Sequence, residues 1–162
     1  AYWFARALPE DGDIVLTEID EDELDAAREY FERGGLASRA HFEHGDAIDI
    51  VGEYDGPFDV VLIDNEKDRY REAFEAVRGN LRPGSLVLAD NAVAAGHVDG
   101  EEVLSLLRSE RAADADSGGE GIEDPDSGSK GIAEYLDHVR NAEGFETVLL
   151  PLGEGVAVTR KR

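Results

Sequence analysis

Two apolar stretches that each end in acid constrain the fold of this chain more than any other feature. Residues 58–64 read FDVVLID and residues 84–91 read GSLVLADN, with a helical pattern between them. Near-continuous apolar runs of this length are typical of strands in a parallel sheet that is covered on both faces. Ligands of open α/β sheets bind beyond the carboxyl ends of the strands. The sequence therefore predicts that Asp64, Asp90 and Asn91 gather at one edge of a sheet.

These three side chains offer two carboxylates and one carboxamide, and Lys67 follows one turn after the first acid. Oxygen ligands of this kind suit a hard divalent cation, with coordination positions left for water or substrate. Taken singly, each residue has a structural alternative. Asp64 could cap a helix, Asp90 and Asn91 could form a turn, and Lys67 could be a solvated surface lysine. The combination at this spacing favours a metal-assisted transfer site.

The rest of the chain alternates between the two hydrophobic periodicities. Strands are predicted at residues 14–19, 40–44, 60–64, 86–90, 145–150 and 156–160, and helices at 2–8, 22–33, 47–51, 70–81, 101–111 and 132–141. This order predicts an α/β fold with a doubly wound, Rossmann-like sheet, mostly parallel, that closes with an antiparallel hairpin. We expect a single domain over residues 1–162, interrupted at 112–131 by an acidic, Gly- and Ser-rich mobile loop.

The charge balance excludes some partners. The net charge is −22, and the acids are spread over the whole chain rather than held in one tail. Such a surface repels nucleic acid and anionic membranes, so neither is an expected partner. It is typical of proteins adapted to high salt, where at about 1 M the screening length falls to ~3 Å. No apolar run reaches the length of a membrane helix and no cysteine is present, so we expect a cytoplasmic, halophilic protein without thiol chemistry.

The segment LIDNEKDRY, followed by LVLADN, resembles the metal-binding segment of the cation-dependent, S-adenosylmethionine-dependent O-methyltransferases of the catechol and caffeoyl-coenzyme A type. VLTEID is similar to the second strand of that family, and HGDA to its adenine-binding turn. FETVLLPLGEGVAVTRK resembles its closing strand pair, so the likeness extends over nearly the whole chain except the acidic loop. The resemblance implies a Rossmann-like methyltransferase sheet and methyl transfer to a hydroxyl of a small catechol-like aromatic.

The resemblance also implies roles for individual residues. Asp64, Asp90 and Asn91 would bind Mg²⁺ or another divalent cation, and Lys67 would be the general base. The S-adenosylmethionine site would include Glu18 at the ribose, Asp46 and Ala47 at the adenine, and Asp64. Taken alone, Glu18 could be one more surface acid and Asp46 a turn residue. The family also suggests a homodimer.

The first strand and the glycine-rich loop of that family are absent from this sequence, and we expect the chain to be a fragment of a longer polypeptide. Without that strand, the strands at 14–19 and 60–64 would keep unpaired backbone groups, each costing roughly 1–3 kcal/mol when buried. Two other functions stay open. FDVVLID also resembles the phospho-acceptor strand of a two-component receiver domain. The fold could also be a non-catalytic methyltransferase remnant that binds a partner.

Overall fold

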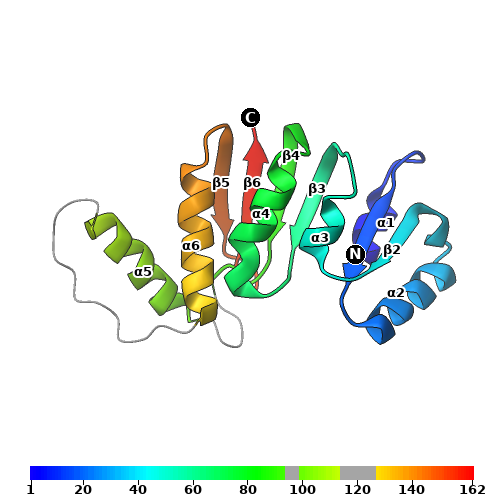
Figure 1. Cartoon of the computed structure of the whole chain (residues 1–162), viewed down its shortest axis with the longest axis horizontal. Coiled ribbons are helices and arrows are strands. Elements are labelled where there is room, and N and C mark those ends of the chain that lie inside the picture. The colour runs from blue at the N-terminus through cyan, green and yellow to red at the C-terminus, as the bar shows by residue number, and fades with distance from the viewer. Residues whose placement is uncertain (94–98, 114–126) are drawn as a thin grey trace. The chain divides into compact units, whose positions relative to one another are not determined.

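The computed structural model describes residues 1–93, 99–113 and 127–162. The chain divides into two compact units, residues 1–54 and 55–162, and Figure 1 shows their elements. The single domain expected over 1–162 stays a prediction, and each unit is described by itself below.

Unit 1 is built on a pair of parallel strands joined by a helix. β1 (Ile14–Glu18) pairs in register with β2 (Ala40–His44), and α2 (Glu21–Arg33) connects them through the short 3-10 turn η1 (Ala37–Arg39). The helix begins where the sequence provides a cap, because Asp20 Oδ1 accepts hydrogen bonds from the amides of the first turn at 2.9 and 3.2 Å. α1 (Tyr2–Ala7) and α3 (Ala47–Val51) complete the unit.

Aromatic rings hold the helices of unit 1 on its strands. Phe31 of α2 is buried, and its ring meets Tyr2 of α1 at 5.8 Å and Phe42 of β2 at 5.5 Å, both edge to face. Edge-to-face pairs contribute about 0.5–1.5 kcal/mol beyond the area that they bury. Phe31 therefore packs the apolar face of α2 against both α1 and β2.

Unit 2 contains a four-stranded mixed sheet with the order β3-β4-β6-β5. β3 (Phe58–Ile63) runs parallel to β4 (Leu81–Ala89), whereas β6 (Val156–Lys161) is antiparallel to both β4 and β5 (Phe145–Leu150). The predicted C-terminal antiparallel hairpin is thus confirmed. Among the described residues, β1 pairs only with β2 and β3 only with β4. Each therefore keeps one unpaired edge in the part of the chain that the structure describes.

Two helices of unit 2 lie on one face of this sheet. α4 (Tyr70–Arg78) and α6 (Ser127–Asn141) cover the strands, and α5 (Gly100–Ala113) packs against α6 (Figure 1). The core between helices and sheet is aromatic, with centroids 5.3–6.4 Å apart among Tyr70, Phe74, Tyr135 and Phe145. On the opposite face, Val60, Leu62 and Val148 are 46%, 44% and 51% exposed.

Two predicted boundaries were wrong. Leu81 was expected to end a helix, but α4 ends at Arg78 with Gly79 as its cap, and Leu81 pairs with Phe58 as the first residue of β4. The loop expected at 112–131 is helical at both ends, since α5 continues to Ala113 and α6 begins at Ser127. The start of α6 has poor helix formers, yet its Ser129 and Gly131 are buried, so tertiary packing overrides propensity. Residues 114–126 of that loop lie outside the described ranges.

Candidate functional site

The carboxyl ends of β3 and β4 bring the first predicted residues together. The two strands are parallel, with Ile63 opposite Ala89. Asp64 and Asp90 therefore follow neighbouring strand ends. The amide of Asp90 still donates to the carbonyl of Ile63 at 3.2 Å, so this edge stays ordered beyond the last strand residue.

Lys67 lies at the centre of this group. It begins the 3-10 turn η2 (Lys67–Arg69), and its side chain is only 19% exposed. Its Nζ donates to Asp64 Oδ1 at 3.4 Å, to Asn91 Oδ1 at 3.2 Å and to the hydroxyl of Tyr70. Two of the three predicted ligand residues thus direct an oxygen at one positive charge.

Asp90 and Asn91 are held in a tight turn. Asp90 Oδ1 accepts from the amide of Asn91 at 2.8 Å, which engages one of its two carboxylate oxygens. Asn91 has φ +52°, in the left-handed region that residues other than glycine seldom adopt. Its Nδ2 donates to Glu154 Oε2 at 2.5 Å. Such a backbone conformation persists where its surroundings fix it from several sides.

Tyr70 also belongs to this group of residues, although the sequence indicated for it only a place in the helix predicted at 70–81. Tyr70 is completely buried, accepts from Lys67 and donates to the carbonyl of Asp90 at 3.0 Å. Burial first, and then the negative charges of Asp64 and Asp90, raise the pKa of Tyr70 far above its ordinary value. Its hydroxyl therefore stays protonated as a donor. The available signal was the spacing of three residues between Lys67 and Tyr70, which places both on one helical face.

Glu154 was also missed. It lies in the turn between β5 and β6, where the sequence shows only one more acid among many. Only the three-dimensional contact with Asn91 distinguishes it, so no sequence signal would have found it.

The predicted cofactor residues of unit 1 lie at the carboxyl edge of its own strand pair. The carbonyl of Glu18 accepts from the amide of Gly45 at 2.9 Å, which joins the end of β1 to the turn after β2. Glu18 Oε1 accepts from the amides of the next two residues at 2.8 and 3.0 Å. Asp46 is the N-cap of α3, with Ala47 as the first helical residue. The structural use of Asp46 as a cap is thus present, and it engages one carboxylate oxygen.

One oxygen each of Asp64 and Asn91 lies close to the Lys67 ammonium, and carboxylate and carboxamide oxygens are the ligands that a hard cation takes. Within the described ranges, no three His, Cys, Asp or Glu side chains could together hold a metal. The predicted trio differs from such a cluster in having a carboxamide as its third member.

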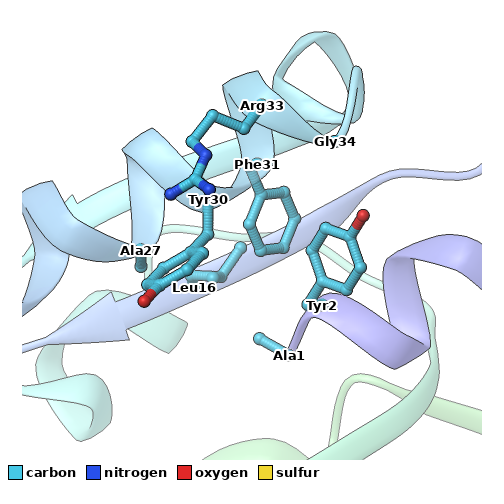
Figure 2. Close-up of a pocket in the computed structure, with 8 residues that line it drawn as sticks. All are labelled: Ala1, Tyr2, Leu16, Ala27, Tyr30, Phe31, Arg33 and Gly34. Carbon is cyan, nitrogen blue, oxygen red and sulfur yellow. The ribbon is translucent and has the colours of Figure 1, made fainter.

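A pocket of about 600 Å³ opens elsewhere, in unit 1. Figure 2 shows its aromatic lining, in which Tyr30 and Phe31 of α2 lie beside Tyr2 of α1. None of the predicted site residues lines it, and Ala1 forms part of its wall.

Comparison with known proteins agrees with the geometry. The sequence model of the O-methyltransferase family matches residues 1–162, and the chain belongs to this family. A catechol O-methyltransferase from Niastella koreensis is 40% identical over 100 residues, which are 59% of this chain and 45% of that protein. Caffeoyl-CoA O-methyltransferase 3 from Nicotiana tabacum is 30% identical over 100 residues, 58% of this chain and 41% of its own.

Solved structures share the fold. The O-methyltransferase from Bacillus cereus, in complex with SAH, matches with a TM-score of 0.77 and 25% identity over 99% of this chain and 67% of that one. TomG from Streptomyces achromogenes, in complex with SAM, matches with a TM-score of 0.75 and 24% identity over 98% and 66%. The Rossmann-like methyltransferase fold is thus confirmed. The chain spans less than half the length of the curated relatives it matches.

The family match over the whole chain replaces the receiver-domain alternative. No helix in the described ranges has both the length and the apolar character needed to cross a bilayer.

Proposed function

We propose that this chain transfers a methyl group from S-adenosylmethionine to a hydroxyl of a small, catechol-like aromatic, with Mg²⁺ or another divalent cation bound at Asp64, Asp90 and Asn91. The observation that carries the proposal is the position of the Lys67 ammonium, 3.4 Å from Asp64 Oδ1 and 3.2 Å from Asn91 Oδ1. A cation site and a candidate base therefore share one set of oxygens. Family membership and the catechol O-methyltransferase relative support the same chemistry.

Each residue has a defined task in this mechanism. A divalent cation, when bound, would supply Lewis acidity and orient the substrate. Asp64, Asp90 and Asn91 would hold it. Lys67, in its neutral amine form, would take the proton from the acceptor hydroxyl as general base and become the ammonium. Tyr70 keeps Lys67 in place through its buried hydroxyl, which is fixed in turn by the carbonyl of Asp90.

The methyl donor is proposed to bind at the carboxyl edge of β1 and β2. Glu18 accepts hydrogen bonds from the amides of the next two residues through Oε1, and its Oε2 would accept from the ribose hydroxyls. Asp46 and the amide of Ala47 would recognise the adenine. Methyl transfer needs the acceptor oxygen in line with the sulfonium methyl, and positioning of this kind supplies much of the rate in such reactions.

The test is methyl transfer from radiolabelled S-adenosylmethionine to catechol, with and without a chelator. Lys67→Ala should lower turnover by about 10²–10⁴-fold, the usual contribution of a general base, and leave the affinity for S-adenosylmethionine unchanged. Lys130→Ala is the control, since Lys130 is an exposed lysine whose Nζ lies 3.8 Å from Glu134. A fully active Lys67→Ala protein would remove the proposed base. Binding of S-adenosylmethionine without any transfer would instead favour the non-catalytic alternative.

Three expectations stay predictions beside this proposal: the identity of the cation as Mg²⁺, a homodimer, and adaptation to high salt.

A further inference from the structure

The turn of the terminal hairpin is hydrogen-bonded to the loop after β4. The amide of Ala92 donates to the carbonyl of Gly155 at 2.8 Å, and the amide of Val93 donates to the carbonyl of Glu154 at 3.0 Å. Gly155 has φ +89°, and a Cβ there would overlap the Val93 side chain. The hairpin turn therefore fits this loop closely, and the backbone contacts of Glu154 and Gly155 hold Glu154 beside Asn91.

The carboxamide of Asn91 has two ends that are alike in shape but opposite in hydrogen bonding. Its Oδ1 can only accept, and its Nδ2 can only donate. Glu154 is an acceptor and lies 2.5 Å from Nδ2, whereas Lys67 is a donor and lies 3.2 Å from Oδ1. Rotating the carboxamide by half a turn would set a donor against Lys67 and an acceptor against Glu154. Only one orientation satisfies both neighbours, and it directs the oxygen to the cation position.

We propose that Glu154 is a positioning residue that fixes which end of the Asn91 carboxamide faces the cation position. The inference rests on the proposed function, because it concerns the ligand set of the cation. Glu154 does not touch that position itself and acts through Asn91. Removing such an outer partner of a metal ligand costs about 10- to 100-fold in metal affinity or activity.

Four side chains at position 154 separate orientation from charge. Glu154→Gln keeps an acceptor oxygen but loses the negative charge, Glu154→Ala loses both, and Glu154→Lys offers only donors. If orientation governs, Mn²⁺ affinity should follow the order Glu, Gln, Ala, Lys, with Gln close to the wild type and Ala about 10- to 100-fold weaker. If the charge alone acts, Gln and Ala should weaken binding equally, and that result would overturn the proposal.

The measurement is Mn²⁺ binding by electron paramagnetic resonance, at one fixed salt concentration, with thermal unfolding checked for each variant. Glu146→Ala is the matched control, because Glu146 is an acid of the same hairpin that pairs with Arg162 at 3.1 Å instead of with Asn91. It should bind Mn²⁺ as the wild type does. A Glu154→Ala protein with wild-type Mn²⁺ affinity would also refute the positioning role.

A second readout separates this inference from the proposed function. The side-chain NH₂ signals of Asn91, assigned by their loss in Asn91→Asp, should shift in metal-free Glu154→Ala and Glu154→Lys but stay near their wild-type positions in Glu154→Gln. A wild-type protein that binds no Mn²⁺ would contradict the proposed function. In that case, unchanged Asn91 signals in Glu154→Ala would also refute the positioning role of Glu154. Shifted signals would show that Glu154 does contact the Asn91 carboxamide.

Discussion

Gly131 sets the position of the turn that carries Lys67. Gly131 lies on α6, and a Cβ added there would overlap the Cα of Asp68 and come within 2.5 Å of the Lys67 carbonyl oxygen and 2.7 Å of the Asp68 amide nitrogen. All three are backbone atoms of η2 or its neighbours, so no side-chain rotation can relieve the overlap. Ordinary contact begins at 3.4 Å, and η2 would have to move by about 1 Å to reach it.

Gly131→Ala therefore has two opposing effects. Alanine in a helix interior is favoured over glycine by up to about 1 kcal/mol, whereas overpacking costs about 1–3 kcal/mol. We expect a net loss of about 1–2 kcal/mol in the free energy of unfolding. For a chain of this size that corresponds to a Tm lower by about 2–8 °C. A displacement of Lys67 by about 1 Å can reduce turnover by on the order of 10²-fold.

Gly79→Ala is the matched control, because Gly79 caps α4 with φ −67° and a Cβ there would meet nothing within 4 Å. It should raise stability by about 0.4–1 kcal/mol. Thermal unfolding by circular dichroism and methyl transfer to catechol measure both quantities. In a Lys67→Ala background, Gly131→Ala should cause no further loss of residual turnover, because both changes act on one group. A Gly131→Ala protein that is more stable than the wild type and equally active would refute the reasoning.

Three further predictions follow from other contacts and from the charge. Tyr70→Phe should lower the free energy of unfolding by about 1–3 kcal/mol, because the carbonyl of Asp90 loses its donor, and it should also lower turnover. If the variant loses this stability but keeps normal turnover, Tyr70 has only a structural role. Burial alone would raise the pKa of Glu75, but hydrogen bonds from His138 and Arg78 outweigh it and hold the pKa below the ordinary 4.5. Below about pH 4.5 the unfolded state therefore binds more protons than the folded state, so this contact stabilises the protein only at higher pH. Glu75→Gln should lower the free energy of unfolding by less than about 1 kcal/mol at neutral pH. In acid, its Tm should equal that of the wild type. With a net charge of −22, Tm should rise between about 0.1 M and about 1 M KCl as the screening length falls from ~10 to ~3 Å; a constant or falling Tm would contradict salt adaptation.

The strand positions could be predicted from the sequence because each strand is a short apolar run between turn residues. β2 and β5 agree with the expected ranges residue by residue, and β1 ends only one residue earlier. The start of β4 was missed because Leu81 continues the helical spacing of α4 and is followed by Pro83. Pairing with Phe58 decides its conformation, and a contact between distant residues leaves no local pattern.

The candidate site shows the same division between local and distant information. Asp64, Asp90 and Asn91 could be predicted to follow neighbouring strand ends, because parallel strands end at one edge. Lys67 could be placed beside them because one turn of chain separates it from Asp64. Glu154 could not be predicted, since the hairpin turn that carries it reaches Asn91 only when β6 pairs with β4.

The antiparallel pairing of β6 with β4 determines which residues lie beside Asp90 and Asn91. An antiparallel strand inserted beside β4 brings the turn that precedes it to the carboxyl end of β4, where Asp90 and Asn91 lie. A parallel strand in that place would bring its own carboxyl end there instead, and the residues before it would lie at the opposite edge. The hairpin thus adds to the sheet and at the same time delivers an acceptor to Asn91 and two backbone hydrogen bonds to the loop after it. In this unit the direction of one strand determines which groups surround the proposed cation position.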